Sequence, residues 1–134
     1  MAMNQNQKTN LKNSKAACID CNVNNFYKIW LTFLTPLHKL TSKSIEVAAE
    51  LLKQRKMLSK KVNDPIILNK LLFGPETKNL ITKRCKITSS NYYVVIGKLK
   101  KAGFITESGI NNLFIPDKNY DGNDYHIHIM FHIK

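Results

Sequence analysis

Apolar residues recur at intervals of three and four along most of the chain, which is the spacing of helices that bury one face. Residues 42–57 show this spacing most clearly, with apolar residues on one side, basic residues on the other, and Thr41 or Ser42 as an N-cap. The same spacing predicts shorter helices over 25–34, 66–72, 75–85 and 89–101. Pro36 ends the first of these. We therefore expect a mainly α-helical protein with a small β component.

Strand signals gather near the end of the chain. Gly103 stops the preceding helix, and "FITESGINNLFIP" then predicts two short strands around a Ser-Gly or Asn-Asn turn. Residues 124–134 contain "YHIHIMFHIK", in which apolar and polar residues alternate strictly, so we expect a half-buried strand. One face of this strand carries Tyr125, Ile127, Ile129, Phe131 and Ile133, and the other carries His126, His128, Met130, His132 and Lys134.

The chain carries a large excess of positive charge, with a formal net charge of +12 and a pI near 9.7. Residues 78–101 hold seven basic residues and no acidic one. Such an excess attracts polyanions, which include nucleic acid, anionic membranes and acidic protein surfaces. The most apolar run, "FYKIWLTFLTPL", is too short to span a bilayer and contains Lys28 and Pro36, so we expect no membrane partner.

Residues 1–24 differ in composition from the rest and are rich in Asn, Gln, Lys and Ser. Such a segment buries too little apolar surface to offset its ordering entropy, so we expect a flexible basic arm that a protein or DNA partner orders. Residues 25–134 then form a single domain, with its core over 40–116 and an added C-terminal strand. We expect a cytoplasmic protein, because the first 25 residues show no secretory signal and three cysteines make no disulfide framework.

The stretch "ITKRCKIT", followed by "SSNYYVVIGKLKKAGFI", resembles the winged helix-turn-helix family. Ile81, Cys85 and Ile87 occupy the apolar positions of that family's supporting helix and turn, and "LKKAGFI" matches the exit into its wing. The resemblance covers roughly residues 40–116 and implies a winged helix-turn-helix fold. The chain departs from the family in two places. Lys86 stands where glycine is favoured, which requires a left-handed backbone or a longer turn, and the candidate wing "TESGINN" is acidic and lacks basic residues.

The resemblance implies a double-stranded DNA-binding protein that regulates transcription or replication, acts as a homodimer or larger assembly, and places residues 89–101 in the major groove. Base contacts are expected from the outward residues Ser90, Asn91, Tyr93 and Val94. Phosphate contacts are expected from Lys83, Arg84, Lys86, Lys98, Lys100 and Lys101. Neutralising about six phosphates would give a slope near −5 for log affinity against log salt concentration.

A second interpretation stays open, in which the protein is a structural or adaptor protein of a virion or another large assembly. Basic residues on neighbouring helices often form only a solvated or protein-facing surface. The acidic wing and a C-terminal strand suited to strand addition favour this interpretation. The Asn-, Lys- and Ile-rich composition also resembles small proteins of phages and mobile elements, whose location is the host cytoplasm or the virion.

Catalytic and metal-binding chemistry has little support in the sequence. The chain contains no glycine-rich phosphate loop, no H-E-x-x-H and no G-x-S-x-G motif, so we expect no enzyme. Cys18 and Cys21 form a lone C-x-x-C, whereas a zinc site needs about four ligands. His126, His128 and His132 share one strand face, and H-x-H chelates a metal only when a third ligand approaches. We therefore expect no metal and no cofactor.

Overall fold

The computed structural model describes residues 14–22, 24–116 and 125–132, and these residues are mainly helical with two small antiparallel strand pairs. They divide into two compact units. One lies within Tyr27–Tyr120, and the other combines residues from the two ends of the chain, within Met1–Phe26 and Asp121–Lys134. The C-terminal strand pairs with an N-terminal segment, so it lies in a different unit from the helices.

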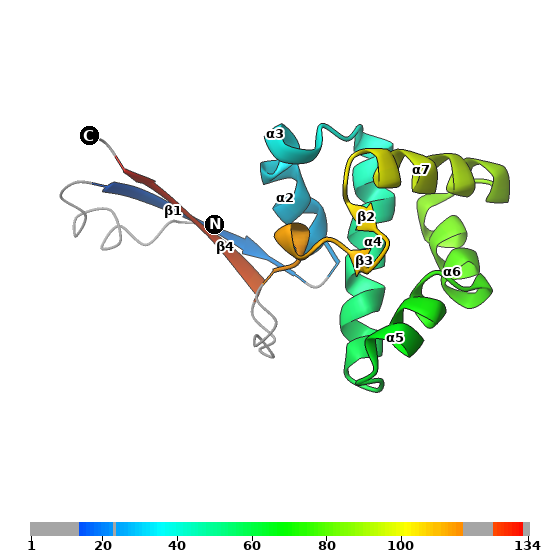
Figure 1. Ribbon diagram of the computed structural model, residues 1–134. Coiled ribbons are helices and arrows are strands. Elements are labelled where there is room, and N and C mark those ends of the chain that lie inside the picture. Colours follow the sequence, from blue (N-terminus) through cyan, green and yellow to red (C-terminus); the bar gives the residue numbers. More distant parts are fainter. Residues whose placement is uncertain (1–13, 23, 117–124, 133–134) are drawn as a thin grey trace. The chain divides into compact units, whose positions relative to one another are not determined.

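Six helices lie between residues 26 and 101 (Figure 1). They are α2 (Phe26–Phe33), α3 (Thr35–His38), α4 (Ser42–Ser59), α5 (Pro65–Leu72), α6 (Pro75–Cys85) and α7 (Ser89–Lys101). The five helices expected from apolar spacing are confirmed to within two residues at each end. The short helix α3 was not predicted. Pro36 was expected only to end the first helix, but it also lies in the first turn of α3, where proline is favourable. No helix among the described residues is both long enough and apolar enough to cross a membrane.

Side-chain caps fix where the main helices begin. The backbone N–H of Ser44 donates to Oγ1 of Thr41, which confirms one of the two caps expected for α4. Asp64 caps α5 in the same way, through the N–H of Ile66. Thr88 caps α7. Its backbone is extended (φ −77°, ψ 162°), and its Oγ1 accepts from the N–H of Asn91 at 3.1 Å.

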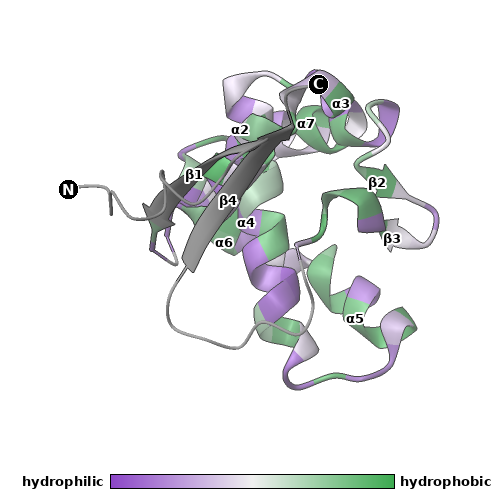
Figure 2. Ribbon diagram, turned by 90° about the vertical axis from the view of Figure 1, so that its left-hand side faces the viewer, coloured by the Kyte–Doolittle hydropathy of each residue, from purple (hydrophilic) through white to green (hydrophobic). Residues whose placement is uncertain are grey.

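Helix α4 is the centre of the helical unit and packs against α5, α6 and α7. Its residues Val47, Ala48 and Leu51 are completely buried. The other helices and the segment after α7 contribute large side chains that are also completely buried, namely Leu31, Leu72, Ile81, Leu99 and Phe104. Hydrophobic and hydrophilic segments alternate along α4, whereas most of α5 is hydrophobic (Figure 2). Burying a side chain of this size stabilises the fold by about 1.5–3 kcal/mol.

After α7 the chain forms a very short hairpin, so the two expected strands are confirmed. Strand β2 (Ile105–Thr106) pairs with β3 (Gly109–Ile110), and a 3₁₀ turn, η1 (Asn112–Phe114), follows. The hairpin turn is fastened to α5, since Nδ2 of Asn69 donates to the carbonyl oxygen of Ser108 at 3.0 Å. A methyl group at Gly109 would lie 2.6 Å from Asn69 Oδ1, so glycine allows this close approach. The hairpin is therefore small and held against the helical unit.

The second unit is a two-stranded ribbon, in which β1 (Ser14–Cys21) pairs antiparallel with β4 (Tyr125–His132) (Figure 1). The strand expected over 124–134 is confirmed for the described residues. The flexible arm expected over 1–24 is wrong for residues 14–21, and residues 1–13 and 23 lie outside the described residues. The physical reason is that β1 is stabilised by a partner strand more than 100 positions later, which no local pattern within 1–24 reveals.

Candidate nucleic-acid interface

Helices α6 and α7 are joined by a tight turn that begins at Lys86. This residue adopts a left-handed backbone (φ 55°, ψ 49°), and its N–H donates to the carbonyl oxygen of Thr82. The N–H of Ile87 donates to the same oxygen at 3.1 Å. A lysine at this position was expected to require either a left-handed backbone or a longer turn, and the structure shows the left-handed backbone. Because such a backbone costs a non-glycine residue about 1–2 kcal/mol, the turn holds local strain.

Helix α7 has one buried and one exposed side. Tyr92, Val95 and Leu99 are buried against the helical unit. Burial raises the pKa of Tyr92 to about 12, so its hydroxyl group stays neutral at physiological pH. The four residues expected to face outward are all exposed, namely Ser90, Asn91, Tyr93 and Val94. Tyr93 and Val94 are the large side chains among them and expose 60% and 56% of their surface.

The exposed side of α7 runs along the whole helix. Ser90, Val94, Gly97 and Lys101 follow one another at spacings of four, three and four, so they form one line along the helix. All four are exposed. A methyl group added at Gly97 would meet no atom within 4 Å outside the neighbouring helix backbone, so none of the described residues requires a glycine there. Glycine in a helix interior costs about 0.5–1 kcal/mol relative to alanine.

Lys78 of α6 lies beside Tyr93 of α7. Its Nζ is 3.3 Å from the Tyr93 hydroxyl and 4.9 Å from the centroid of the ring, which is a cation–π distance. The pair holds the exposed tyrosine in place and adds a positive charge next to the exposed side of α7. Lys78 was not among the residues expected at the interface. Its position in the basic block 78–101, which contains no acidic residue, could have indicated it.

The basic residues expected at phosphates fall into two groups. One group is exposed and consists of Lys83, Lys86, Lys98, Lys100 and Lys101. The last three lie in the final turn of α7, where their positive charges stabilise the negative end of the helix dipole. Arg84 differs, because its Nη1 lies 3.7 Å from Oε2 of Glu50, an oxygen that is buried and accepts no hydrogen bond. The charge of Arg84 therefore also balances a carboxylate of α4.

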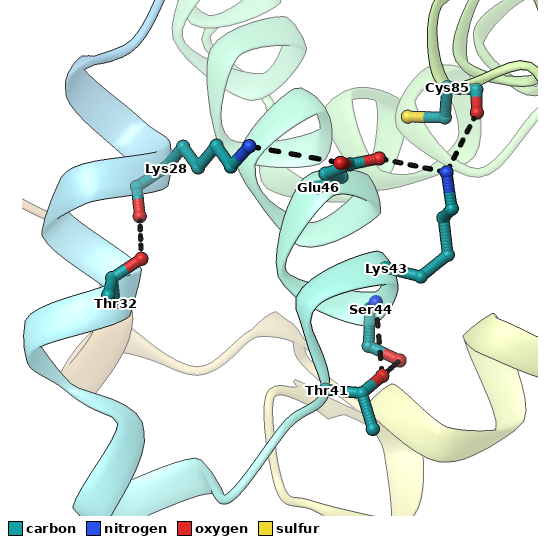
Figure 3. A network of polar contacts seen from close by, with 7 residues as sticks. All are labelled: Lys28, Thr32, Thr41, Lys43, Ser44, Glu46 and Cys85. Atoms are coloured by element: carbon teal, nitrogen blue, oxygen red, sulfur yellow. Dashed lines mark hydrogen bonds and ion pairs between the residues drawn. The ribbon is translucent and has the colours of Figure 1, made fainter.

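A polar network fixes the end of α6 relative to α4 (Figure 3). Lys43 Nζ donates to Glu46 Oε2 at 3.1 Å and to the carbonyl oxygen of Cys85 at 3.2 Å. Lys28 of α2 approaches the other carboxylate oxygen of Glu46 at 3.8 Å. Lys43 thus satisfies a carbonyl at the C-terminus of α6, where a cation is favourable. The turn into α7 is positioned by this contact.

Cys85 at the same helix end is chemically quiet. Burial, together with the carboxylates of Glu50 and Glu46, raises the pKa of its thiol to about 11. The reactive thiolate form is therefore scarce at physiological pH. Among the residues whose side chains are described, 21–22 and 24–116, no group of three or more His, Cys, Asp or Glu residues is placed to hold a metal ion.

A second exposed surface lies on α5. Four large apolar residues are exposed there or just after the helix, and we call them the α5 surface: Ile66, Ile67, Leu71 and Phe73. Ile66 is the most exposed, at 69%. Clustered exposed apolar side chains on one helix mark a contact surface more often than scattered ones do.

Comparisons of the chain with protein-family models, with curated proteins and with solved structures return no match.

Proposed function

We propose that this protein binds double-stranded DNA through the exposed side of α7, as a compact winged helix-turn-helix regulator of transcription or replication acting in the cytoplasm. The observation that carries the proposal is Gly97. This glycine lies on the exposed side of α7, where no described residue packs closely enough to require it. Basic residues flank that side. A glycine allows a helix backbone to approach a partner closely, and a helix that docks in the major groove is one element that uses such an approach.

In this proposal the four outward residues read the bases. The side-chain amide of Asn91 pairs with the N6 and N7 atoms of adenine, and the Val94 side chain contacts a thymine methyl group. Tyr93, held by Lys78, makes a further contact at the groove wall. Ser90 lies in the first turn of α7, where an exposed hydroxyl group can donate to a base or to a phosphate.

The surrounding lysines position the helix on the DNA backbone. Lys83 and Lys86 approach one strand near the turn, and the lysines of the last turn of α7 approach the other. Lys78 is an added member of this set. Arg84 contributes less, because it also neutralises Glu50. The hairpin plays a minor part, since it is short, acidic at Glu107 and tied to α5.

The test is fluorescence anisotropy with labelled random-sequence duplex DNA over a salt series. Binding with a slope near about −5 supports contact with about six phosphates. The comparison is a quadruple variant in which Lys83, Lys86, Lys98 and Lys101 are replaced by glutamine. Its slope should be shallower by about 3–4, at about −1 to −2. If the wild-type chain binds no duplex at about 50 mM salt, where counterion release favours association, the proposal fails.

The second candidate function is that of a structural or adaptor protein of a virion or another large assembly. The α5 surface favours it, because four exposed apolar residues on one side of a helix suit a protein partner. The same surface could also join two copies of the chain in a DNA-binding dimer. Sedimentation of wild-type protein and of Ile66→Asp separates these cases. A dimer dissociated by the substitution indicates self-association, and an unchanged monomer that binds no DNA favours the adaptor function.

A further inference from the structure

The ribbon formed by β1 and β4 brings together residues that lie more than 100 positions apart in the sequence. Its register pairs Cys18 with His128 and Asp20 with His126. Residues that are directly opposite in an antiparallel pair share a face, and so do residues two apart on one strand. These four residues therefore occupy neighbouring positions on a single face of the ribbon.

The register also shows that the two cysteines of the C-x-x-C motif do not lie on the same face. Cys18 and Cys21 are three apart on one strand, so they lie on opposite faces and their C-x-x-C spacing forms no chelating pair. Cys21 is instead opposite Tyr125, on the face that carries the isoleucines of β4. His132 shares the face of the four residues, but it is four positions beyond His128, or about 13 Å along the strand.

The four residues make a chemically complete set of ligands for zinc. Zinc is held tetrahedrally by cysteine sulfur, histidine nitrogen and carboxylate oxygen, at about 2.0–2.3 Å from the metal. Opposite positions on paired strands have Cβ atoms about 4.5–5.5 Å apart, and positions two apart on a strand are about 7 Å apart. These four positions form a square. An ion on the β1 side of the square is within reach of the shorter Cys and Asp side chains, and the longer His side chains reach it from β4. H-x-H on β4 gains the ligands it needs from C-x-D on β1.

We propose that Cys18, Asp20, His126 and His128 bind a single zinc-type divalent transition-metal ion on one face of the ribbon. With four ligands from the protein the site is closed, which is typical of structural rather than catalytic zinc. The ion joins the two ends of the chain. An isolated two-stranded ribbon is marginally stable in water, and a metal clip that closes so long a loop stabilises it strongly. This proposal is independent of DNA binding by α7.

The test uses the full chain, reduced and freed of metal with a chelator, and titrated with Co²⁺ as a spectroscopic substitute for zinc. We expect 1:1 binding with the visible bands of tetrahedral cobalt and a thiolate-to-cobalt charge-transfer band. Zinc should displace the cobalt. Cys18→Ser should remove the charge-transfer band, and His126→Ala or His128→Ala should weaken binding at least about tenfold.

Two matched controls lie on the same strands. Cys21→Ser and His132→Ala should leave the cobalt spectrum and affinity unchanged, because neither position belongs to the square. Cys18→His keeps four donor groups, so it should bind cobalt without the charge-transfer band, which separates loss of a ligand from loss of folding. Amide hydrogen exchange gives a second readout, with slower exchange in β1 and β4 when zinc is added.

Three results would overturn the proposal. The first is a wild-type chain that binds no cobalt at micromolar concentrations. The second is cobalt binding that survives the double variant of Cys18→Ser and His128→Ala. The third is cobalt binding that Cys21→Ser or His132→Ala weakens as much as His128→Ala does.

Discussion

Replacing Gly97 with alanine should make the protein more stable and a weaker DNA binder. Gly97 lies in the interior of α7, on its exposed side, and a methyl group there meets no atom within 4 Å. The substitution therefore carries no steric cost in the free protein. It restricts the unfolded chain and favours the helix, so the gain in unfolding free energy is about 0.5–1 kcal/mol.

That gain corresponds to a rise in Tm of about 2–6 °C for a unit of this size. Thermal unfolding followed by circular dichroism measures it. Anisotropy with duplex DNA should show an affinity that is lower by about five- to tenfold, because losing about 1–1.4 kcal/mol of close contact changes Kd by that factor. Gly109→Ala is the control, and its effect on Tm should be the opposite. Gly109 has φ +108°, and an added methyl group would lie 2.6 Å from Asn69, so the Tm should fall.

A lower Tm for Gly97→Ala would refute the structural premise, because it would mean that this side of α7 is packed against something. A higher Tm with unchanged DNA affinity would refute the premise that DNA binds to this side of α7, because the DNA would then not approach the helix at Gly97.

Three further predictions follow from the same surface and from the groups buried beneath it. Asn91→Ala should reduce the preference for a selected DNA sequence over random DNA, whereas Lys98→Ala should weaken binding to both DNAs alike. If both variants lose the same affinity on the two DNAs, base reading by Asn91 is contradicted. Lys86→Gly should raise the unfolding free energy by about 1 kcal/mol, because it relieves the left-handed backbone, and should make the salt slope shallower by about 0.9. Lys39→Gly, at the other left-handed lysine (φ 56°), should give the same stability gain in urea unfolding without changing the slope. Burial raises the pKa of Cys85 to about 11 and that of Tyr92 to about 12, so the folded state holds these protons more tightly than the unfolded state, and stability should fall as pH rises above about 9. Cys85→Ala should remove the part of this loss between about pH 9 and 11, and a urea midpoint that is flat with pH in the wild-type protein would show that these groups are not buried.

Local patterns in the sequence were enough to predict five of the six helices between residues 26 and 101. Apolar spacing and breakers such as Pro36 and Pro75 act within a few residues, so helix bounds could be predicted closely. The inward and outward sides of α7 followed from the same spacing, since Tyr92 and Leu99 are buried and Asn91 is exposed. The strained turn at Lys86 could also be anticipated, because glycine is the residue that usually adopts its backbone.

Contacts between distant residues could not be read from the sequence. The pairing of β1 with β4 depends on a partner strand at the other end of the chain, so residues 14–21 alone do not show that they form a strand. The same limit applies to Arg84, which lies against Glu50 of α4. It applies equally to Lys78, whose contact with Tyr93 depends on how α6 packs on α7. Chemistry that depends on such pairings, such as the metal site proposed on the ribbon, can be inferred only once the register is known.

The central claim is that the exposed side of α7 is the surface that meets DNA, and amide chemical-shift mapping by NMR tests it most directly. Duplex DNA is added to isotopically labelled protein, and the shift of each backbone amide is followed. We expect the largest changes within residues 86–101, including Asn91, Val94 and Gly97, and little change at Ile66 and Leu71 of the α5 surface. Changes concentrated on the α5 surface, or no changes at a DNA excess, would contradict the account.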